Sequence, residues 1–246
     1  MIDSTAVEFK HVSKGFQNRN VLTDVSFELP EGKALCILGR SGTGKSVTLK
    51  LLIGLLKPDS GSVCIGAEDI EGLSGEELLR VRRGIGFLFQ SAALFDSVTV
   101  GDNLALPLHR FNRRMPPQQV KQEVAAMLEQ VGLEKDVNKF PGELSGGMKK
   151  RAGLARALVL KPRLLLVDEP SSGLDRITAS EIDELLLKVK GEAKTTMVIV
   201  THDVRGARRL ADTVAVLDKG CLAGFGTFQE LESSGNATVK ELISES

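Results

Sequence analysis

Residues 39–46 read GRSGTGKS, a pattern that combines three glycines with a lysine and a terminal hydroxyl side chain. Glycines have no Cβ, so they allow backbone N–H groups to turn toward phosphate oxygens. The Lys45 ammonium would place positive charge on the β and γ phosphates, and the Ser46 hydroxyl could ligate Mg²⁺. We therefore predict a nucleotide-binding loop formed by Gly39, Arg40, Ser41, Gly42, Thr43, Gly44, Lys45, Ser46 and Val47.

Two carboxylates end an apolar run later in the chain, in the sequence LLLVDEP at 164–170. The apolar residues indicate a buried strand that ends at Asp168, whose carboxylate could hold Mg²⁺. Glu169 lies one position further, where a carboxylate could polarise an attacking water. General-base assistance of this kind accelerates a reaction by ~10²- to 10⁴-fold. Together with the glycine loop, these residues predict hydrolysis of a nucleoside triphosphate.

The nucleotide base is predicted to be adenine. A guanine pocket is expected to show Asn or Thr, then Lys, any residue and Asp. Asn138 and Lys139 begin in this way, but Pro141 stands where the aspartate is required. Phe16 is a candidate aromatic platform on which adenine could stack. The alternative for Phe16 is an ordinary place in the hydrophobic core.

A second glycine-rich segment reads LSGGMKKR at 144–151. Ser145, Gly146 and Gly147 precede three cationic side chains at the expected start of a helix, an arrangement that suits an anion. The chain therefore carries two segments suited to phosphate. A single bound nucleotide does not explain both.

The elements that must position these residues follow from the spacing of apolar side chains. Strand-like runs alternate with helical spacing in both halves of the chain, which predicts a mostly parallel sheet with its ligand at the carboxyl ends of the strands. Prolines open and Gly132 closes the middle helix of the central region. The expected strands are 6–12, 21–29, 34–38, 84–90, 164–168, 196–202 and 213–218, and helical character is expected at 46–56, 97–160 and 178–190.

Composition sets limits on the function. With 246 residues, 42% of them hydrophobic, the chain can bury a full core. Its 32 basic and 32 acidic residues balance, which argues against nucleic acid as a partner. No run approaches the ~18 apolar residues of a spanning helix, and the N-terminus resembles no signal peptide. Cys36 lies in an apolar run and is expected to be a buried thiol in a reducing compartment.

Five motifs in this order and spacing resemble those of the ATP-binding-cassette (ABC) ATPases. They are GRSGTGKS, Gln90 after an apolar strand, LSGGM, LLLVDEP with SSGLD at 171–175, and a lone His202 after TMVIVT. The resemblance implies an α/β P-loop NTPase fold with a RecA-like, mostly parallel sheet, an antiparallel β subdomain and an inserted α-helical subdomain. Residues 1–246 would form one ABC ATPase domain, with the nucleotide-binding core at 1–90 and 161–246 and the helical subdomain at 91–160.

The same resemblance implies roles for the site residues. Glu169 would be the catalytic base, and His202 would contact the γ-phosphate and help to position the attacking water. Gln90 would touch Mg²⁺ together with Ser46 and Asp168, and it would relay the nucleotide state. In this family two copies pack head to tail, which explains the second glycine segment. Ser145, Gly146 and Gly147 would grip the ATP of the partner copy, and Asp175 would bridge the two sites.

Four positions depart from the family pattern, although none removes a catalytic group. Met148 stands where glutamine is common, Arg40 replaces a proline, Phe16 replaces a tyrosine, and Arg176 stands where proline is frequent. Methionine cannot make the hydrogen bonds of glutamine, so the contact with the partner copy is expected to be weaker or arranged differently.

The resemblance further implies separate integral-membrane permease subunits, with this chain cytoplasmic and peripheral at the inner face of the cytoplasmic membrane. Phe95 is expected either in the groove that receives the permease or in the core of the helical subdomain. The phrase GFLFQSAALFDSVTVGDNLALPL, together with Met148, resembles the Mla-type ATPases that move phospholipid with MCE-domain proteins, sometimes with a STAS-domain partner. A C-terminal tail that braces the dimer is not expected here.

Three alternatives remain open. The first is an ABC cassette for another cargo, such as amino acids or lipoproteins. The second is a soluble ABC ATPase of translation or DNA repair, which would be expected to show tandem cassettes or a long coiled-coil insertion. The third is a nucleotide-binding regulator, which should lack the carboxylate that Glu169 provides.

Overall fold

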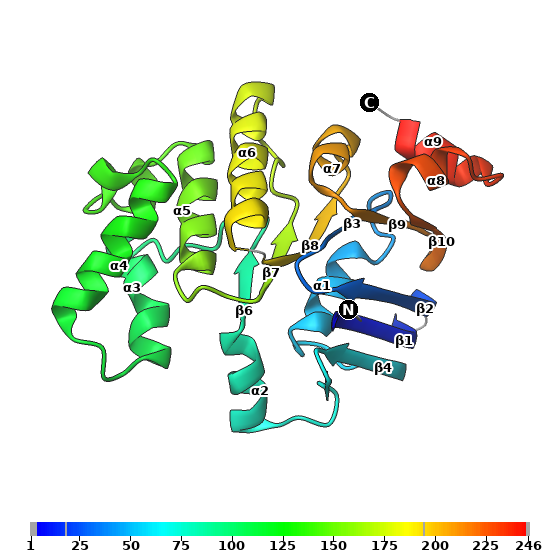
Figure 1. Ribbon diagram of the computed structural model, residues 1–246, viewed down its shortest axis with the longest axis horizontal. Helices are drawn as coiled ribbons and strands as arrows, with labels where there is room; N and C mark the ends of the chain where they lie inside the picture. Colours follow the sequence, from blue (N-terminus) through cyan, green and yellow to red (C-terminus); the bar gives the residue numbers. More distant parts are fainter. Residues whose placement is uncertain (1–3, 18, 194, 245–246) are drawn as a thin grey trace. The chain divides into compact units, whose positions relative to one another are not determined.

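The computed structural model describes residues 4–17, 19–193 and 195–244, and the chain divides into two compact units. The first unit comprises residues 1–82 and 186–246, and the second comprises residues 83–185. Figure 1 shows the first unit at both ends of the colour scale and the helices of the second unit in its middle.

Three of the predicted parallel strands belong to the first unit. β3 (Ala34–Leu38) lies between β8 (Thr196–Thr201) and β9 (Thr213–Asp218), and both neighbours run parallel to it. All residues of β3 and β8 are buried, which explains why their sequences are continuous apolar runs rather than alternating ones. β10 (Cys221–Gly226), which was not predicted, pairs antiparallel with β9 at the edge. Cys36 is buried in β3 as expected.

A four-stranded antiparallel sheet completes the β structure of this unit (Figure 1). Its order is β2 (Arg19–Pro30), β1 (Thr5–Phe16), β4 (Ser60–Ile65) and β5 (Glu68–Asp69). Alternate residues of β2 are buried, as one covered face requires. The rings of Phe9 and Phe27 stack with centroids 4.5 Å apart, and Phe225 of β10 stacks on Phe27. The predicted strands 6–12 and 21–29 are confirmed, whereas β4 and β5 were missed.

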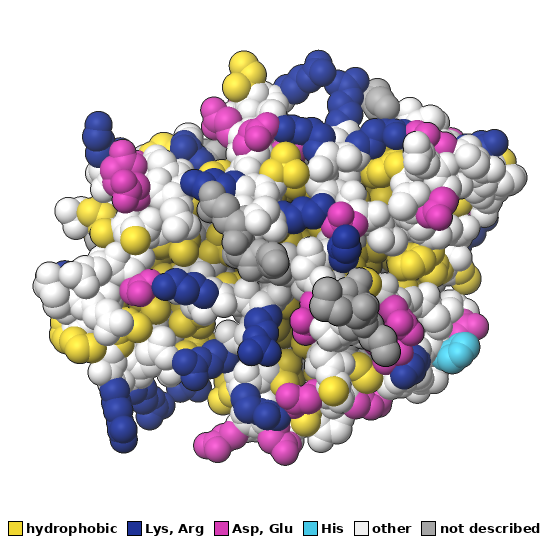
Figure 2. Space-filling view, in the orientation of Figure 1, with side chains coloured by type: hydrophobic (Ala, Val, Ile, Leu, Met, Phe, Trp, Pro, Cys, Tyr) yellow, Lys and Arg dark blue, Asp and Glu magenta, His cyan; other side chains and the backbone are white. Residues whose placement is uncertain are grey.

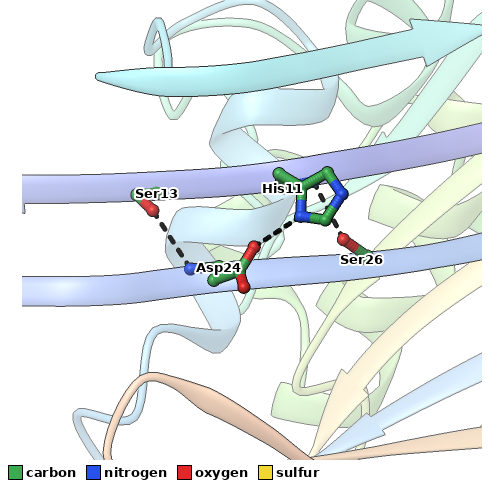
Figure 3. Close-up of polar contacts among 4 residues, drawn as sticks. All are labelled: His11, Ser13, Asp24 and Ser26. Carbon is green, nitrogen blue, oxygen red and sulfur yellow. Dashed lines mark hydrogen bonds and ion pairs between the residues drawn. The ribbon is translucent and has the colours of Figure 1, made fainter.

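β1 and β2 are irregular where their pairing register shifts, around Val12 (Figure 3). His11 and Asp24 have φ angles of 50° and 53°, which are uncommon for residues other than glycine. His11 Nδ1 lies 2.7 Å from Asp24 Oδ1, the His11 amide donates to Ser26 Oγ, and the Asp24 amide donates to Ser13 Oγ. These side chains satisfy backbone groups that the bulge removes from the ladder.

The helices of the first unit are short. α1 (Lys45–Leu52) follows the glycine loop, and it ends before the predicted Leu56 because Gly54 turns the chain with a φ of 62°. α2 (Gly75–Arg83) extends to the boundary between the units, consists mostly of charged residues and buries none of them; no helix was predicted there. The remaining helices are α7 (Val204–Leu210), α8 (Phe228–Glu232) and α9 (Ala237–Ser244).

The second unit contains two parallel strands and a group of helices. β6 (Ile85–Leu88) pairs with β7 (Leu164–Asp168), and α5 (Gly146–Leu158) packs against β6. α3 (Val100–Phe111) and α4 (Pro117–Gln130) pack against each other and against α5, as Figure 1 shows. Two 3₁₀ turns, η1 (Glu134–Asp136) and η2 (Pro141–Glu143), precede α5. α6 (Arg176–Ala193) begins in this unit and ends in the first.

Local sequence explains the ends of these helices. Thr99 and Asp102 form a capping box at α3, in which each satisfies a backbone N–H group of the other. Pro116 is the N-cap of α4 and Pro117 its first residue, while Gly132 beyond its end has a φ of 66°. The predicted boundaries of the middle helix are thus confirmed.

The face drawn in Figure 2 carries charges of both signs. Lys and Arg side chains and Asp and Glu side chains are intermixed over the face drawn in Figure 2. Within the described residues, no helix is both long enough and apolar enough to cross a membrane.

Candidate functional site

The glycine loop connects β3 to α1 in the first unit, as the sequence predicted. Gly44 is the N-cap of α1 with a φ of 102°, and it provides no side-chain cap to the helix. A side chain at Gly44 would also meet Leu22 and the carbonyl of Val21, because the start of β2 passes close to this turn. Glycine is required here for both reasons. Because no side chain of the N-cap residue bonds the first N–H groups of α1, the start of this helix suits an anion.

Lys45 is buried although it carries a charged side chain. Its ammonium donates to the carbonyl oxygens of Gly39 at 2.8 Å and Arg40 at 3.2 Å, so it lies against the beginning of the loop. Thr43 Oγ1 also donates to Arg40, at 2.9 Å. These bonds fold the loop onto itself and hold a positive charge within it.

Strand register brings His202 next to the loop. Leu38, the last residue of β3, pairs with Thr201, the last residue of β8. Gly39 and His202 therefore leave neighbouring parallel strands at the same level. His202 is exposed, and Asp203 caps α7 immediately after it by accepting from the amides of Arg205 and Gly206.

Phe16 and Arg40, two of the four positions that depart from the family pattern, are both exposed in the first unit. Phe16 is 44% exposed, so it is not a core residue, and it ends the strand that turns into β2. The Lys14 ammonium lies 5.6 Å from the centre of its ring. The Arg40 guanidinium pairs with Glu241 of α9 at 2.5 Å, and both side chains are more than half exposed. Ser41, Gly42 and Ser46 are exposed, and Val47 is half-buried.

The second unit brings Gln90 and the two carboxylates together. Leu88 of β6 pairs with Val167 of β7, so Gln90 and Asp168 follow neighbouring parallel strands near the same level. Gln90 Nε2 donates to Ser172 Oγ at 3.2 Å. Asp168 is half-buried, whereas Glu169 is only 8% exposed.

Glu169 has a φ of 47°, in the left-handed region. For a non-glycine residue this conformation costs about 1–3 kcal/mol, and it persists only where surrounding contacts impose it. The Glu169 carbonyl accepts from the Ser172 amide at 3.2 Å and from the Lys150 ammonium at 2.8 Å. The residue predicted to act as the base is thus held by contacts from two segments.

The second glycine segment begins α5. Ser145 is its N-cap, and Ser145 Oγ accepts from the Met148 amide at 3.3 Å. Gly146 is exposed and Gly147 is buried. A methyl group placed at Gly147 would collide with Cγ2 of Thr178, whereas one placed at Gly146 would make an ordinary contact, 3.5 Å from Leu174 Cδ2.

Asp175 holds Thr178 in that place. Its carboxylate accepts from the Thr178 hydroxyl at 2.7 Å and from the amides of Ile177 and Thr178. The Thr178 hydroxyl contributes most to a lowered pKa of the Asp175 carboxyl, followed by the Thr178 amide. Asp175 thus caps the start of α6 and positions the side chain that packs on Gly147.

This packing predicts that Gly147→Ala will destabilise the fold by about 1–3 kcal/mol, the usual cost of overpacking. The midpoint of urea denaturation, measured without nucleotide, should fall. Thr178→Ser removes the colliding methyl and keeps the hydroxyl for Asp175, so adding it should restore most of the loss. Gly146→Ala is the matched control and should leave the midpoint nearly unchanged. Equal midpoints for both single alanine variants would contradict the packing.

Sequence reasoning counted Lys150 among three cations that suit an anion, whereas its ammonium is used within the fold, and it gave no role to Arg156. Lys150 donates to Glu169, and Arg156 donates to the carbonyls of Ala92 and Ala93 that follow Gln90. Adjacent lysines and arginines gave no signal for these distant partners. Phe95 is 57% exposed, so the alternative that places it in the core is wrong.

The residues present fit ATP and Mg²⁺. Lys45 supplies a charge beside an uncapped helix start, and Ser46 follows it. Among the described residues no three His, Cys, Asp or Glu side chains cluster as a metal cage. Mg²⁺ is ordinarily bound by one or two carboxylates plus phosphate oxygens and water, a donor set that Asp168 and a nucleotide can supply.

A comparison with protein families decides what kind of protein this is. The family model for the ABC transporter matches residues 22–172, which include the glycine loop, Gln90, the signature LSGGM and both carboxylates. The chain belongs to the ABC transporter family. The resemblance and the fold class predicted from the motifs are confirmed, and this ABC cassette is an ATPase that binds ATP.

Curated ABC relatives extend the similarity over most of the chain. A probable ribonucleotide transport ATP-binding protein, mkl, of Mycobacterium leprae is 42% identical over 97% of this chain and 68% of its own length. Its counterpart in Mycobacterium tuberculosis H37Rv is 41% identical over 97% of this chain and 66% of its own. The methionine import ATP-binding protein MetN 1 of Pseudomonas syringae is 39% identical, over 89% and 67%. The ABC cassette thus spans about two thirds of these relatives.

Solved ABC structures share the fold. The cassette MJ0796, in a dimeric post-hydrolysis state with ADP and Pi, has a TM-score of 0.84 at 33% identity, covering 90% of this chain and 98% of its own. CbiO1 of Clostridium perfringens, part of the transporter complex cbiONQ, has a TM-score of 0.85 at 27% identity, covering 99% and 96%.

Proposed function

We propose that two copies of this cassette hydrolyse ATP in composite sites and thereby drive transport through a separate membrane permease. The observation that carries the proposal is the presence of two glycine elements, each at the start of a helix, α1 and α5. Only the first carries the lysine of a nucleotide loop. The second is explained if Ser145, Gly146 and Gly147 close over the nucleotide of the other copy, in keeping with the dimeric form of MJ0796.

In the proposed reaction, the loop residues 39–47 bind the phosphates and Lys45 neutralises charge on the β and γ groups. Mg²⁺, held by Ser46, Gln90 and Asp168, would offset the negative charge that develops on the transferred phosphate. Glu169 accepts a proton from the attacking water, and His202 orients that water and contacts the γ-phosphate. Phe16 stacks on the adenine, and Asp175 links the two sites of the dimer.

Exposed apolar side chains in the second unit support docking to a permease. Phe89, Phe95 and Leu106 are 37%, 57% and 43% exposed, and all three lie in the segment between β6 and the end of α3. Gln90 lies in the same segment, so a protein bound there would respond to the nucleotide state through it. The cassette would then act at the cytoplasmic face of the membrane that holds the permease.

The proposed cargo is phospholipid. The segment from Gly86 to Leu108 and the signature with Met148 resemble the Mla-type ATPases, which makes an MCE-domain protein and a STAS-domain protein candidate partners. The mkl relatives are described as probable ribonucleotide transport proteins and MetN as a methionine import protein. Ribonucleotides and methionine are therefore the competing cargoes.

Reconstitution distinguishes these cargoes. The tagged cassette is purified from the membranes of its own cell, the proteins that accompany it are identified by mass spectrometry, and the complex is placed in liposomes. We expect ATP to move a fluorescent phospholipid between leaflets or to an acceptor, with no ATP-dependent movement of radiolabelled ribonucleotide or methionine.

The same complex with Lys45→Ala is the control and should move none of the three. ATP-driven movement of ribonucleotide or methionine, with phospholipid unmoved, would overturn the lipid assignment. Recovery of the cassette without any integral-membrane protein would overturn the proposal that it works with a permease.

A further inference from the structure

Lys150 is a buried ammonium outside the set of residues that bind nucleotide. It lies on α5, five positions after the N-cap Ser145, and is 5% exposed. Its Nζ donates to the carbonyl oxygen of Glu169 at 2.8 Å. A charged side chain is almost never buried unless it has a partner, and here the partner is the backbone of the proposed base.

The bond from Lys150 is made to a residue whose backbone conformation is unfavourable. With a φ of 47°, Glu169 is in the left-handed region, which a β-carbon disfavours. The amide of Ser172 also donates to this carbonyl, at 3.2 Å. The bond from Lys150 is the shorter of these two, and both help to orient the peptide group from which the Glu169 side chain projects.

The charges around Lys150 are consistent with a fixed position. Burial lowers the pKa of its ammonium, and the carboxylates of Asp168 and then Glu169 oppose that effect. A buried ammonium that is bonded to a carbonyl oxygen and attracted by two carboxylates has little freedom to turn elsewhere, because losing these partners would leave its charge buried without compensation.

Arg156, also on α5, likewise donates to backbone carbonyls of residues with left-handed φ angles. Arg156 donates to the carbonyls of Ala93 at 2.6 Å and Ala92 at 3.0 Å, and these residues have φ angles of 50° and 61°. Lys150 and Arg156 therefore each hold left-handed backbone, in the segments that follow β7 and β6. The recurrence indicates that α5 fixes the shape of both segments.

We propose that Lys150 is a positioning residue for hydrolysis, which fixes the backbone of Glu169 and joins it to the helix that begins with the signature. The inference rests on the proposed role of Glu169 as the base. Because Ser145 and Lys150 belong to one short helix, a shift of α5 when the signature engages a nucleotide would be passed to Glu169.

The test compares Lys150→Met and Lys150→Arg in the full chain, within its transport complex where that complex is available. Methionine fills a similar volume without a donor, whereas arginine keeps the donor. We expect Lys150→Met to lower kcat for ATP hydrolysis by about 10- to 100-fold, since small misplacements of a catalytic group have effects of this size. KM should stay within about 2-fold, and Lys150→Arg should recover most of kcat. Lys121→Met, at an exposed lysine of α4, is the matched control.

A double-mutant cycle separates positioning from general damage. If Lys150 acts through Glu169, Lys150→Met should slow Glu169→Gln by less than about 2-fold, and that pair should still dimerise with ATP. A full 10-fold further loss in the Glu169→Gln background, or a kcat equal to that of Lys121→Met, would overturn the inference. If Lys150→Met does not fold, Lys150→Leu, which also lacks a donor, takes its place, with the same outcomes. If Glu169→Gln alone leaves hydrolysis unchanged, the proposed function fails instead.

Discussion

Glu169→Gln is expected to slow ATP hydrolysis by ~10²- to 10⁴-fold, because the amide cannot accept the proton of the attacking water. Glutamine has the size of glutamate, so the backbone held by Lys150 and Ser172 should keep its conformation. ATP binding should persist, and the closed dimer should accumulate because the step that reopens it is blocked. Single-turnover phosphate release and gel filtration with ATP and Mg²⁺ measure the two effects.

Gly146→Ala in the same background provides the control for the dimer. Its added methyl is tolerated within the fold, so any loss of dimer reports the contact with the partner copy. We expect Gly146→Ala/Glu169→Gln to remain monomeric with ATP. Unchanged turnover in Glu169→Gln would remove Glu169 from its role, and a dimer that ignores ATP would contradict the composite site.

Lys45→Ala is expected to weaken ATP binding by about 100-fold or more. Hydrogen bonds to charged groups contribute about 1.5–3 kcal/mol each, and the ammonium would make one to each of the β and γ phosphates. The loop itself also loses the donor that now satisfies the carbonyls of Gly39 and Arg40. Isothermal titration calorimetry with ATP and Mg²⁺ measures the affinity.

Lys50→Ala is the matched control, because Lys50 lies on the same helix with its side chain exposed. It removes the same charge without touching the loop, so its affinity for ATP should stay close to that of the original chain. Thermal unfolding of both variants in the absence of nucleotide checks that they are folded. Full affinity in Lys45→Ala would contradict the assignment of the loop.

The sequence was informative where burial is complete. The runs at 34–38, 164–168 and 196–201 are rich in apolar residues because nearly all of their side chains are buried, and their strands were predicted to within a residue. β10 contains two glycines and buries none of its residues, and α2 also buries none, so neither carries the apolar run by which the inner strands were recognised.

In the candidate site, too, some features could be predicted from the sequence and others could not. Residues at the carboxyl ends of strands could be placed from the order of the motifs, because parallel strands align those ends. Other features could not be predicted. Glu169 has left-handed backbone, and the bond from Lys150 and the contact between Gly147 and Thr178 each join residues 19 or more positions apart. Each is a consequence of tertiary packing, and the amino-acid types involved are common elsewhere in the chain.

The two signature glycines are constrained for different reasons, and this difference has an evolutionary consequence. A gene that encodes a second, diverged copy of the cassette can lose the partner-binding surface through one substitution at Gly146, since the fold accepts the methyl. Loss through Gly147 requires a compensating change at Thr178 to preserve folding. Dimers of two different cassettes, in which one ATP site no longer hydrolyses, should therefore arise by substitution of Gly146 more often than by substitution of Gly147.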